Sequence, residues 1–143
     1  MSAARRASRQ AALQVLYALD VGRRAERAAA SDEVFEAVAA HFELPEGARA
    51  FAKELVTGVS QQRDAIDALI AEHATNWRVA RMAAVDRNVL RMAVYEMRYG
   101  ATPPTVAIDE AVELARRFGS ERSSAFVNGV LDAIARSRPS EEP

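Results

Sequence analysis

Apolar residues recur at helical spacing along most of the chain, and no segment has the pattern of a β-strand. Of the 143 residues, 31 are alanine, the best helix former, whereas the β-branched and aromatic residues that sheets prefer are sparse. The sequence therefore predicts an all-α protein with six or seven helices. A chain of this length suits one domain, residues 1–143, and we expect residues 137–143 to be a frayed tail.

Glycine, proline and arginine-rich segments separate the expected helices. Ser31 is the expected N-cap of the second helix, Pro45 lies in the first turn of the third, and Gly119 is expected to supply a left-handed C-terminal cap. A short helical turn fits the connection around Trp77. The third segment is one long helix or two helices with a kink between them. The expected helical segments are 4–21, 32–43, 45–74, 84–98, 106–118 and 126–136.

The residue types needed for several kinds of chemistry are missing. The chain has no cysteine, which excludes disulfides, thiolate nucleophiles and cysteine–zinc sites. His41 and His73 have no partner at metal-ligand spacing, and we expect each to be a surface or half-buried helical residue. The six glycines stand alone, so no phosphate-binding or dinucleotide-binding loop is present, and G-x-S-x-G is absent. We therefore expect a binding protein rather than an enzyme, with no cofactor and no metal.

Neither a membrane span nor a signal peptide is expected. No apolar run approaches 18 residues, and no apolar segment follows the basic N-terminus. These features predict a soluble, cytoplasmic protein.

Charge is distributed unevenly along the chain. Residues 1–27 hold six arginines against two acids, a net charge of +4, so the remaining residues carry −5 of the total of −1. A basic end on an acidic body is typical of a protein with two different contact surfaces. By charge counting alone, a solvated helix end explains the pattern equally well.

Arg5, Arg6 and Arg9 form one cluster on the first helix, because successive helical residues are 100° apart. The cluster continues the line of the apolar stripe, so we expect the first two turns to extend beyond the helical bundle. Cations at a helix N-terminus also oppose the helix dipole, and an anionic partner would compensate for this. Arginine suits phosphate because its planar group donates paired hydrogen bonds. The alternative is a basic end that only aids solubility.

Three further positions have both a binding and a packing interpretation. Tyr17 lies two to three turns beyond the arginines and offers a stacking face for a base, and Phe126 lies close to Arg122 near the start of the last helix. Packing is the simpler interpretation for both rings. Asn128 and Gly129 are poor helix formers within a helix, and we expect them to allow close packing or a hydrogen bond to the backbone.

Five sequence blocks together resemble the NusB family of bacterial transcription antitermination factors. They occur in the family's order and span nearly the whole chain, and the last two are the most specific. The blocks are Ala4-Arg5-Arg6, Gln14-Val15-Leu16-Tyr17, the paired segments 85–91 (VDRNVLR) and 94–96 (VYE), the segment 106–115 (VAIDEAVELA) and the segment 126–132 (FVNGVLD).

The resemblance implies a fold of two small packed helical bundles. It also implies a factor that binds single-stranded boxA-type RNA as a heterodimer with NusE, a small-subunit ribosomal protein. Such a factor promotes transcription of ribosomal RNA operons and reaches the RNA polymerase complex indirectly.

The resemblance also assigns roles by position. Arg5, Arg6 and Arg9 match the family's arginine-rich RNA-binding motif, although Ala7 and Ser8 interrupt it here. Other matching positions are Gln14 and Tyr17 on the same helix, Arg122 and Phe126 in a second RNA-facing region, and Asp86 in the NusE interface. Arg122 stands where relatives can have an acid.

Two alternatives remain open. NusB-like domains also resemble the N-terminal RNA-binding domain of ribosomal RNA cytosine methyltransferases, but we do not expect this alternative, because the tail with Arg136-Ser137-Arg138-Pro139 does not resemble a linker to a cofactor-binding domain. A helical homodimer that masks the arginines in the free protein is the other alternative.

Overall fold

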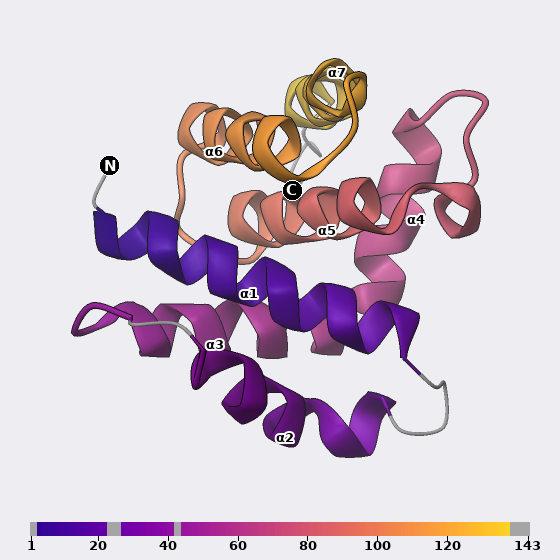
Figure 1. Cartoon of the computed structure of the whole chain (residues 1–143). Coiled ribbons are helices and arrows are strands. Elements are labelled where there is room, and N and C mark those ends of the chain that lie inside the picture. Colours follow the sequence, from indigo (N-terminus) through magenta and orange to yellow (C-terminus); the bar gives the residue numbers. More distant parts are fainter. Residues whose placement is uncertain (1–2, 23–26, 42–43, 138–143) are drawn as a thin grey trace. The chain divides into compact units, whose positions relative to one another are not determined.

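The computed structural model describes residues 3–22, 27–41 and 44–137, and its regular structure there is entirely helical (Figure 1). This confirms the predicted all-α class. The chain divides into two compact units, residues 1–61 and residues 62–143. The helices are α1 (Ala3–Val21), α2 (Arg27–Ala39), α3 (Ala48–Gln61), α4 (Arg63–His73), the 3-10 turn η2 (Val79–Arg81), α5 (Ala84–Arg98), α6 (Pro104–Phe118) and α7 (Ser123–Arg136).

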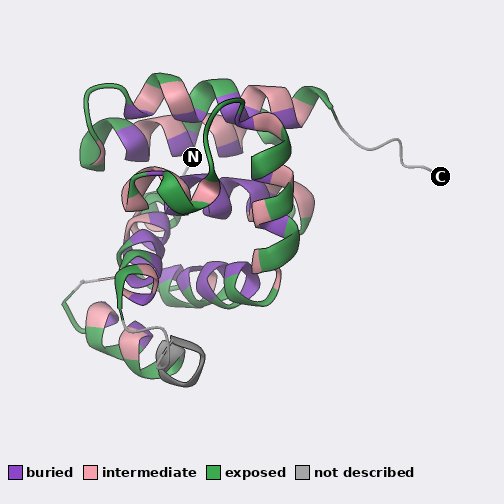
Figure 2. Ribbon diagram, turned by 90° about the vertical axis from the view of Figure 1, so that its right-hand side faces the viewer, coloured by how far each residue is buried: buried purple, intermediate pink, exposed green. Residues whose placement is uncertain are grey.

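The first unit is built around α1, which packs against α2 and α3. Alanine, valine and leucine at helical spacing give α1 one apolar face, and the described residues of both other helices bury apolar side chains as well. In Figure 2 the helices show buried residues on one side and exposed residues on the other, the usual pattern of amphipathic helices. The fully buried side chains of this unit include Val15, Phe35, Leu55 and Val59.

Two helix starts in this unit differ from the prediction. The second helix begins at Arg27, so Ser31 lies inside it rather than at its N-cap; the alanine-rich residues before Ser31 are good helix formers and extend the helix backwards. The third helix begins at Ala48 and not at Pro45. Gly47 has φ +88°, a left-handed conformation that a helix cannot include, so the helix starts after it. Phe42, predicted to lie in the second helix, is outside the described residues.

The segment predicted as one long helix or two kinked ones is two helices. The break falls at Gln62, whose φ of −104° and ψ of 17° depart from helical values, rather than at Gly58, which is buried within α3. The break coincides with the boundary between the two units.

The second unit is organised around α5, which contacts α4, α6 and α7 (Figure 1). Both ends of this helix were predicted correctly. Its second half is buried on nearly all sides, as its apolar sequence indicates, and Val89, Leu90 and Val94 are completely inaccessible. The short turn predicted around Trp77 is η2, just before α5.

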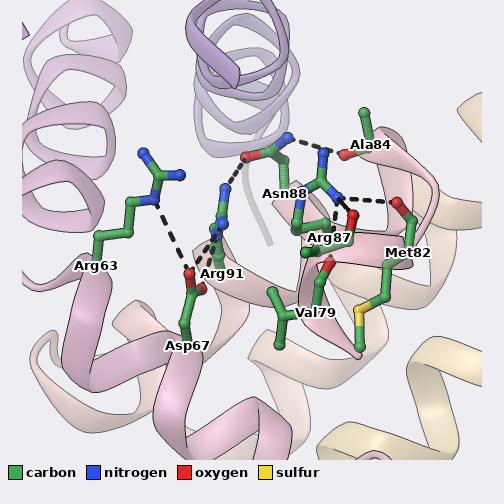
Figure 3. Close-up of polar contacts among 9 residues, drawn as sticks. Arg63, Asp67, Val79, Met82, Ala84, Arg87, Asn88 and Arg91 are labelled. Atoms are coloured by element: carbon green, nitrogen blue, oxygen red, sulfur yellow. Dashed lines mark hydrogen bonds and ion pairs between the residues drawn. The ribbon is translucent and has the colours of Figure 1, made fainter. Parts of the chain in front are cut away.

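A charged contact ties α4 to α5. Arg91 is buried, and its Nε and Nη2 donate to the two carboxylate oxygens of Asp67 at 2.8 and 2.9 Å (Figure 3). Its Nη1 donates to Asn88 Oδ1 at 3.3 Å, and Asn88 Nδ2 donates to the Ala84 carbonyl at 2.8 Å. A two-point arginine–carboxylate contact fixes both distance and orientation, so it holds the two helices in register.

Gly119 does not form the predicted left-handed cap. Its φ of −98° and ψ of −163° are extended. Glycine is needed there for space, because a Cβ would lie 2.4 Å from Ser123 Oγ and 2.6 Å from Ser123 Cβ. Ser123 Oγ accepts a hydrogen bond from the Ser120 amide at 2.9 Å, which closes the turn between α6 and α7.

The packing role predicted for Asn128 and Gly129 is wrong. Both residues are exposed on α7, and a Cβ added to Gly129 would meet no atom within 4 Å.

Beyond this helix, Ser137 hydrogen-bonds His73 Nε2 at 2.9 Å, while residues 138–143 of the predicted frayed tail lie outside the described part.

Candidate nucleic-acid interface

The predicted arginine cluster lies on the first two turns of α1. Arg5 and Arg6 are exposed, whereas Arg9 is only 3% exposed. Ser8 is also buried, and its Oγ donates to the Ala48 carbonyl at 2.7 Å and contacts the Ala4 carbonyl at 2.9 Å. The prediction that the first two turns extend beyond the bundle is therefore wrong, because the start of α3 covers the second turn.

Phe51 explains how arginines can continue an apolar stripe. The guanidinium carbon of Arg5 lies 3.9 Å from the centre of the Phe51 ring, and that of Arg9 lies 5.4 Å from it. A cation over an aromatic face is attracted by the ring's electron density, and the aliphatic stems of arginine add apolar contact. The Phe51 ring of α3 thus offsets part of the unfavourable interaction between these arginines and the dipole of α1.

Gln14 and Tyr17 lie further along α1, and both are exposed. Tyr17 as a residue is 43% exposed, so it is not packed into the core as the simpler interpretation held. An exposed ring on the helix that carries Arg5 and Arg6 can offer a stacking face.

The other three predicted residues belong to the second unit and meet at one pocket. Asp86, Arg122 and Phe126 line a cavity of about 720 Å³ together with Trp77 and Met82. Phe126 is partly buried and meets Trp77 edge to face, with ring centroids 5.8 Å apart and an interplanar angle of 65°. The predicted RNA-facing pair and the predicted partner-binding acid therefore share one site in the structure.

Asp86 lies in the first turn of α5, where the helix dipole favours an acid. Its Oδ1 atom is buried and accepts no hydrogen bond from any described residue. A buried acceptor without a donor is unfavourable, so this oxygen lowers the stability of the fold.

Trp77 is a site residue that the sequence prediction missed. It is 54% exposed, and the segment after it is held by Arg87, whose Nη1 lies 3.1, 3.3 and 2.9 Å from the carbonyl oxygens of Val79, Ala80 and Met82 (Figure 3). The available signal was a lone tryptophan in a connection beside two arginines.

The burial of the two histidines is as expected from the sequence, but only His73 is helical. His73 is half-buried at the end of α4, whereas His41 is exposed in the turn after α2, and the Nδ1 of each lies within hydrogen-bonding distance of the carbonyl four residues earlier. In the part of the chain that the structure describes, no three acidic or histidine side chains are grouped so as to hold a metal ion. None of the helices described is both long and apolar enough to cross a membrane.

Fold and site define a small all-α protein whose two helical units each present exposed arginines beside an aromatic ring. The sequence model of the NusB family matches residues 6–136. Over 133 residues the chain is 47% identical to the transcription antitermination protein NusB of Myxococcus xanthus (strain DK1622), covering 92% of this chain and 94% of that protein. The chain belongs to the NusB family.

Solved structures agree with this assignment. NusB of T. maritima matches with a TM-score of 0.83 and 34% identity, over 96% of this chain and 94% of that one. The structure of the antitermination factors NusB and NusE in complex with dsRNA matches with a TM-score of 0.83 and 28% identity, over 96% and 100% of the two chains.

Proposed function

We propose that this protein is a transcription antitermination factor that binds boxA-type single-stranded RNA as a heterodimer with NusE. It thereby promotes transcription of ribosomal RNA operons in the cytoplasm and acts on RNA polymerase indirectly. The observation that carries the proposal is the pair of exposed arginines, Arg5 and Arg6, at the start of α1 in a chain of the NusB family. Arginines in this position can donate paired hydrogen bonds to phosphate.

The relatives support both partners. One structural neighbour holds NusB and NusE together with dsRNA, and the M. xanthus relative is named an antitermination protein. That neighbour's RNA is double-stranded by name, whereas our proposal concerns a single strand. Exposed rings such as Tyr17 favour the single strand, because unpaired bases are free to stack on aromatic side chains.

We propose a binding role without catalysis. The chain corresponds to the M. xanthus antitermination protein along 94% of that protein's length, which supports this over the domain of an RNA cytosine methyltransferase. An assay for methyl transfer to cytosine in ribosomal RNA is expected to show no product.

Fluorescence anisotropy with a boxA-like RNA tests the proposal, with and without NusE. A scrambled strand and a duplex of the same sequence are the controls. We expect NusE to tighten binding to the boxA-like strand selectively. Equal affinity for all three RNAs, unaffected by NusE, would leave only a non-specific basic helix.

Light scattering across a dilution series tests the homodimer alternative. A dimer that dissociates when RNA is added would support masking of the arginines in the free protein. A monomer at all concentrations, or a dimer that persists in the RNA complex, would count against masking.

A further inference from the structure

Arg9 differs from the other two arginines of the predicted cluster because the fold removes it from solvent. It is 3% exposed, whereas Arg5 and Arg6 are exposed on the same helix. A phosphate of RNA has to approach a guanidinium closely to accept the paired hydrogen bonds that arginine offers. An RNA phosphate can therefore reach Arg5 and Arg6, but not Arg9.

The turn of α1 that carries Arg9 is fixed to the start of α3. The preceding residue, Ser8, is fully buried, and its Oγ donates to the Ala48 carbonyl at 2.7 Å. Ala48 itself is 1% exposed, so the two helices are in close contact beside Arg9. Opening this turn to expose Arg9 would break a buried hydrogen bond, which is unfavourable.

The ring of Phe51 links Arg9 to Arg5. The guanidinium carbon of Arg9 lies 5.4 Å from the centre of the ring, and that of Arg5 lies 3.9 Å from it. Both distances are within the roughly 6 Å over which an aromatic face attracts a cation. One buried and one exposed cation thus share the ring, so a change at the buried cation affects the exposed one through the ring.

An apolar side chain would satisfy the packing at position 9. The position continues the apolar stripe of α1, whose buried members Ala12 and Leu16 follow it at helical spacing. A buried charge is unfavourable unless other groups compensate for it, and a second cation one turn from Arg5 adds repulsion between like charges. A charge at such a position points to a function beyond packing.

We infer that Arg9 is a positioning residue of the RNA-binding surface and contacts no phosphate itself. It holds the ring of Phe51, and the ring holds the guanidinium of Arg5 in the orientation that receives the RNA. Arg5 and Arg6 are then the phosphate-binding arginines of α1. This inference rests on the proposed RNA-binding function, and it departs from the direct role that the resemblance implies for Arg9.

The salt dependence of RNA binding separates the two roles. Each phosphate contact on a single strand contributes about 0.7 to the slope of log K against log salt concentration. With boxA-like RNA and NusE, Arg9→Met should leave this slope at its wild-type value. It should weaken binding about two- to fivefold, the loss expected for one cation–ring contact. A shallower slope in Arg9→Met would show a direct phosphate contact and overturn the inference.

Arg6→Met is the matched control, because it makes the same substitution at an exposed position of the same helix. It should make the slope shallower by about 0.7, the contribution of one phosphate contact.

A double-mutant cycle with Arg5→Ala distinguishes positioning from a merely structural role. If Arg9 acts through Arg5, Arg9→Met should have no further effect on affinity once Arg5 is replaced by alanine. An equal loss in both backgrounds, or no loss in either, would overturn the inference. Urea denaturation of each variant gives the folded fraction to which the affinities are referred.

A measurement on the wild-type protein tests the inference even where Arg9→Met fails to fold. Phenylglyoxal modifies accessible arginine side chains, and mass spectrometry locates the modified residues. Arg9 should stay unmodified with and without RNA, whereas RNA should protect Arg5 and Arg6. Modification of Arg9 that RNA prevents would overturn the inference.

These outcomes separate the inference from the proposed function. If the wild-type protein binds the RNA but Arg9→Met makes the slope shallower, the inference is wrong and the proposed function stands. If the wild-type protein binds no RNA with NusE present, the proposed function fails, and the inference fails with it.

Discussion

The guanidinium of Arg5 lies over the ring of Phe51, 3.9 Å from its centre, and joins the start of α1 to α3. Arg9 approaches the same ring at 5.4 Å, so a single aromatic side chain supports two cations of the proposed RNA-binding motif. Phe51 thus restricts where these arginines can point before any ligand arrives. Such restriction lowers the entropy lost on binding.

Phe51→Leu is expected to weaken RNA binding about two- to fivefold, because each cation–ring contact contributes roughly 0.5–1 kcal/mol. The salt dependence of binding should not change, since all charges remain. Anisotropy titrations at several salt concentrations measure both quantities.

Phe51→Tyr is the matched control, because it keeps the aromatic face. Its affinity should stay near that of wild type. Equal affinities for the leucine and tyrosine variants would show that the ring does not position the arginines.

Loss of the Asp67–Arg91 contact should destabilise the second unit. Asp67→Ala leaves the guanidinium of Arg91 buried without its carboxylate, and we expect a loss of about 3 kcal/mol in the free energy of unfolding, the lower end for a buried pair because Asp67 is 26% exposed. Urea denaturation measures the effect. Arg63→Ala removes the more exposed contact to the same carboxylate at 3.9 Å and should cost less than about 1 kcal/mol. Equal losses in the two variants would contradict this account.

Gly119→Ala should lower the free energy of unfolding by about 1–3 kcal/mol, since the new methyl group would overlap Ser123 and force the α6–α7 turn to shift. Backbone strain is not the cause, because φ at this position is negative. Thermal or urea denaturation gives the value.

The matched control for this variant is Gly129→Ala. Gly129 is a helical glycine with open space around it, so alanine should stabilise the protein by about 0.5–1 kcal/mol. Stabilisation by both variants would mean that the contact at Gly119 is not tight.

Arg87→Met should loosen the segment that follows Trp77. The variant keeps an apolar side chain but loses the donors to the carbonyls of Val79, Ala80 and Met82. We expect the tryptophan emission to move to longer wavelength, because a looser segment exposes the ring of Trp77 to more water. Arg98→Met removes a single 3.4 Å contact, to the Ile134 carbonyl, and should leave the emission spectrum unchanged. An unaltered emission spectrum in Arg87→Met would contradict the positioning role.

The helical class and the limits of α5 could be predicted from the sequence because they depend on local patterns: alanine content and apolar spacing. The burial of Arg9 could not, since it depends on Phe51, more than forty residues away in sequence. For the same reason the sequence suggested a turn conformation at Gly119, where the actual constraint is contact with Ser123.

In the candidate site, too, features that depend on local sequence could be predicted, and those that depend on contacts between distant residues could not. Arg5, Arg6, Arg122 and Phe126 were identified through motifs, which keep their order along the chain. Trp77 belongs to no such motif, and its contact with Phe126 spans two elements that only the fold brings together.

The salt dependence of RNA binding by an Arg5→Ala/Arg6→Ala variant tests the central claim most directly. For boxA-like single-stranded RNA with NusE present, each phosphate contact contributes about 0.7 to the slope of log K against log salt concentration. Loss of two contacts should therefore make the slope shallower by about 1.4 and weaken binding to all RNA sequences. An unchanged slope and affinity would show that α1 does not hold the RNA.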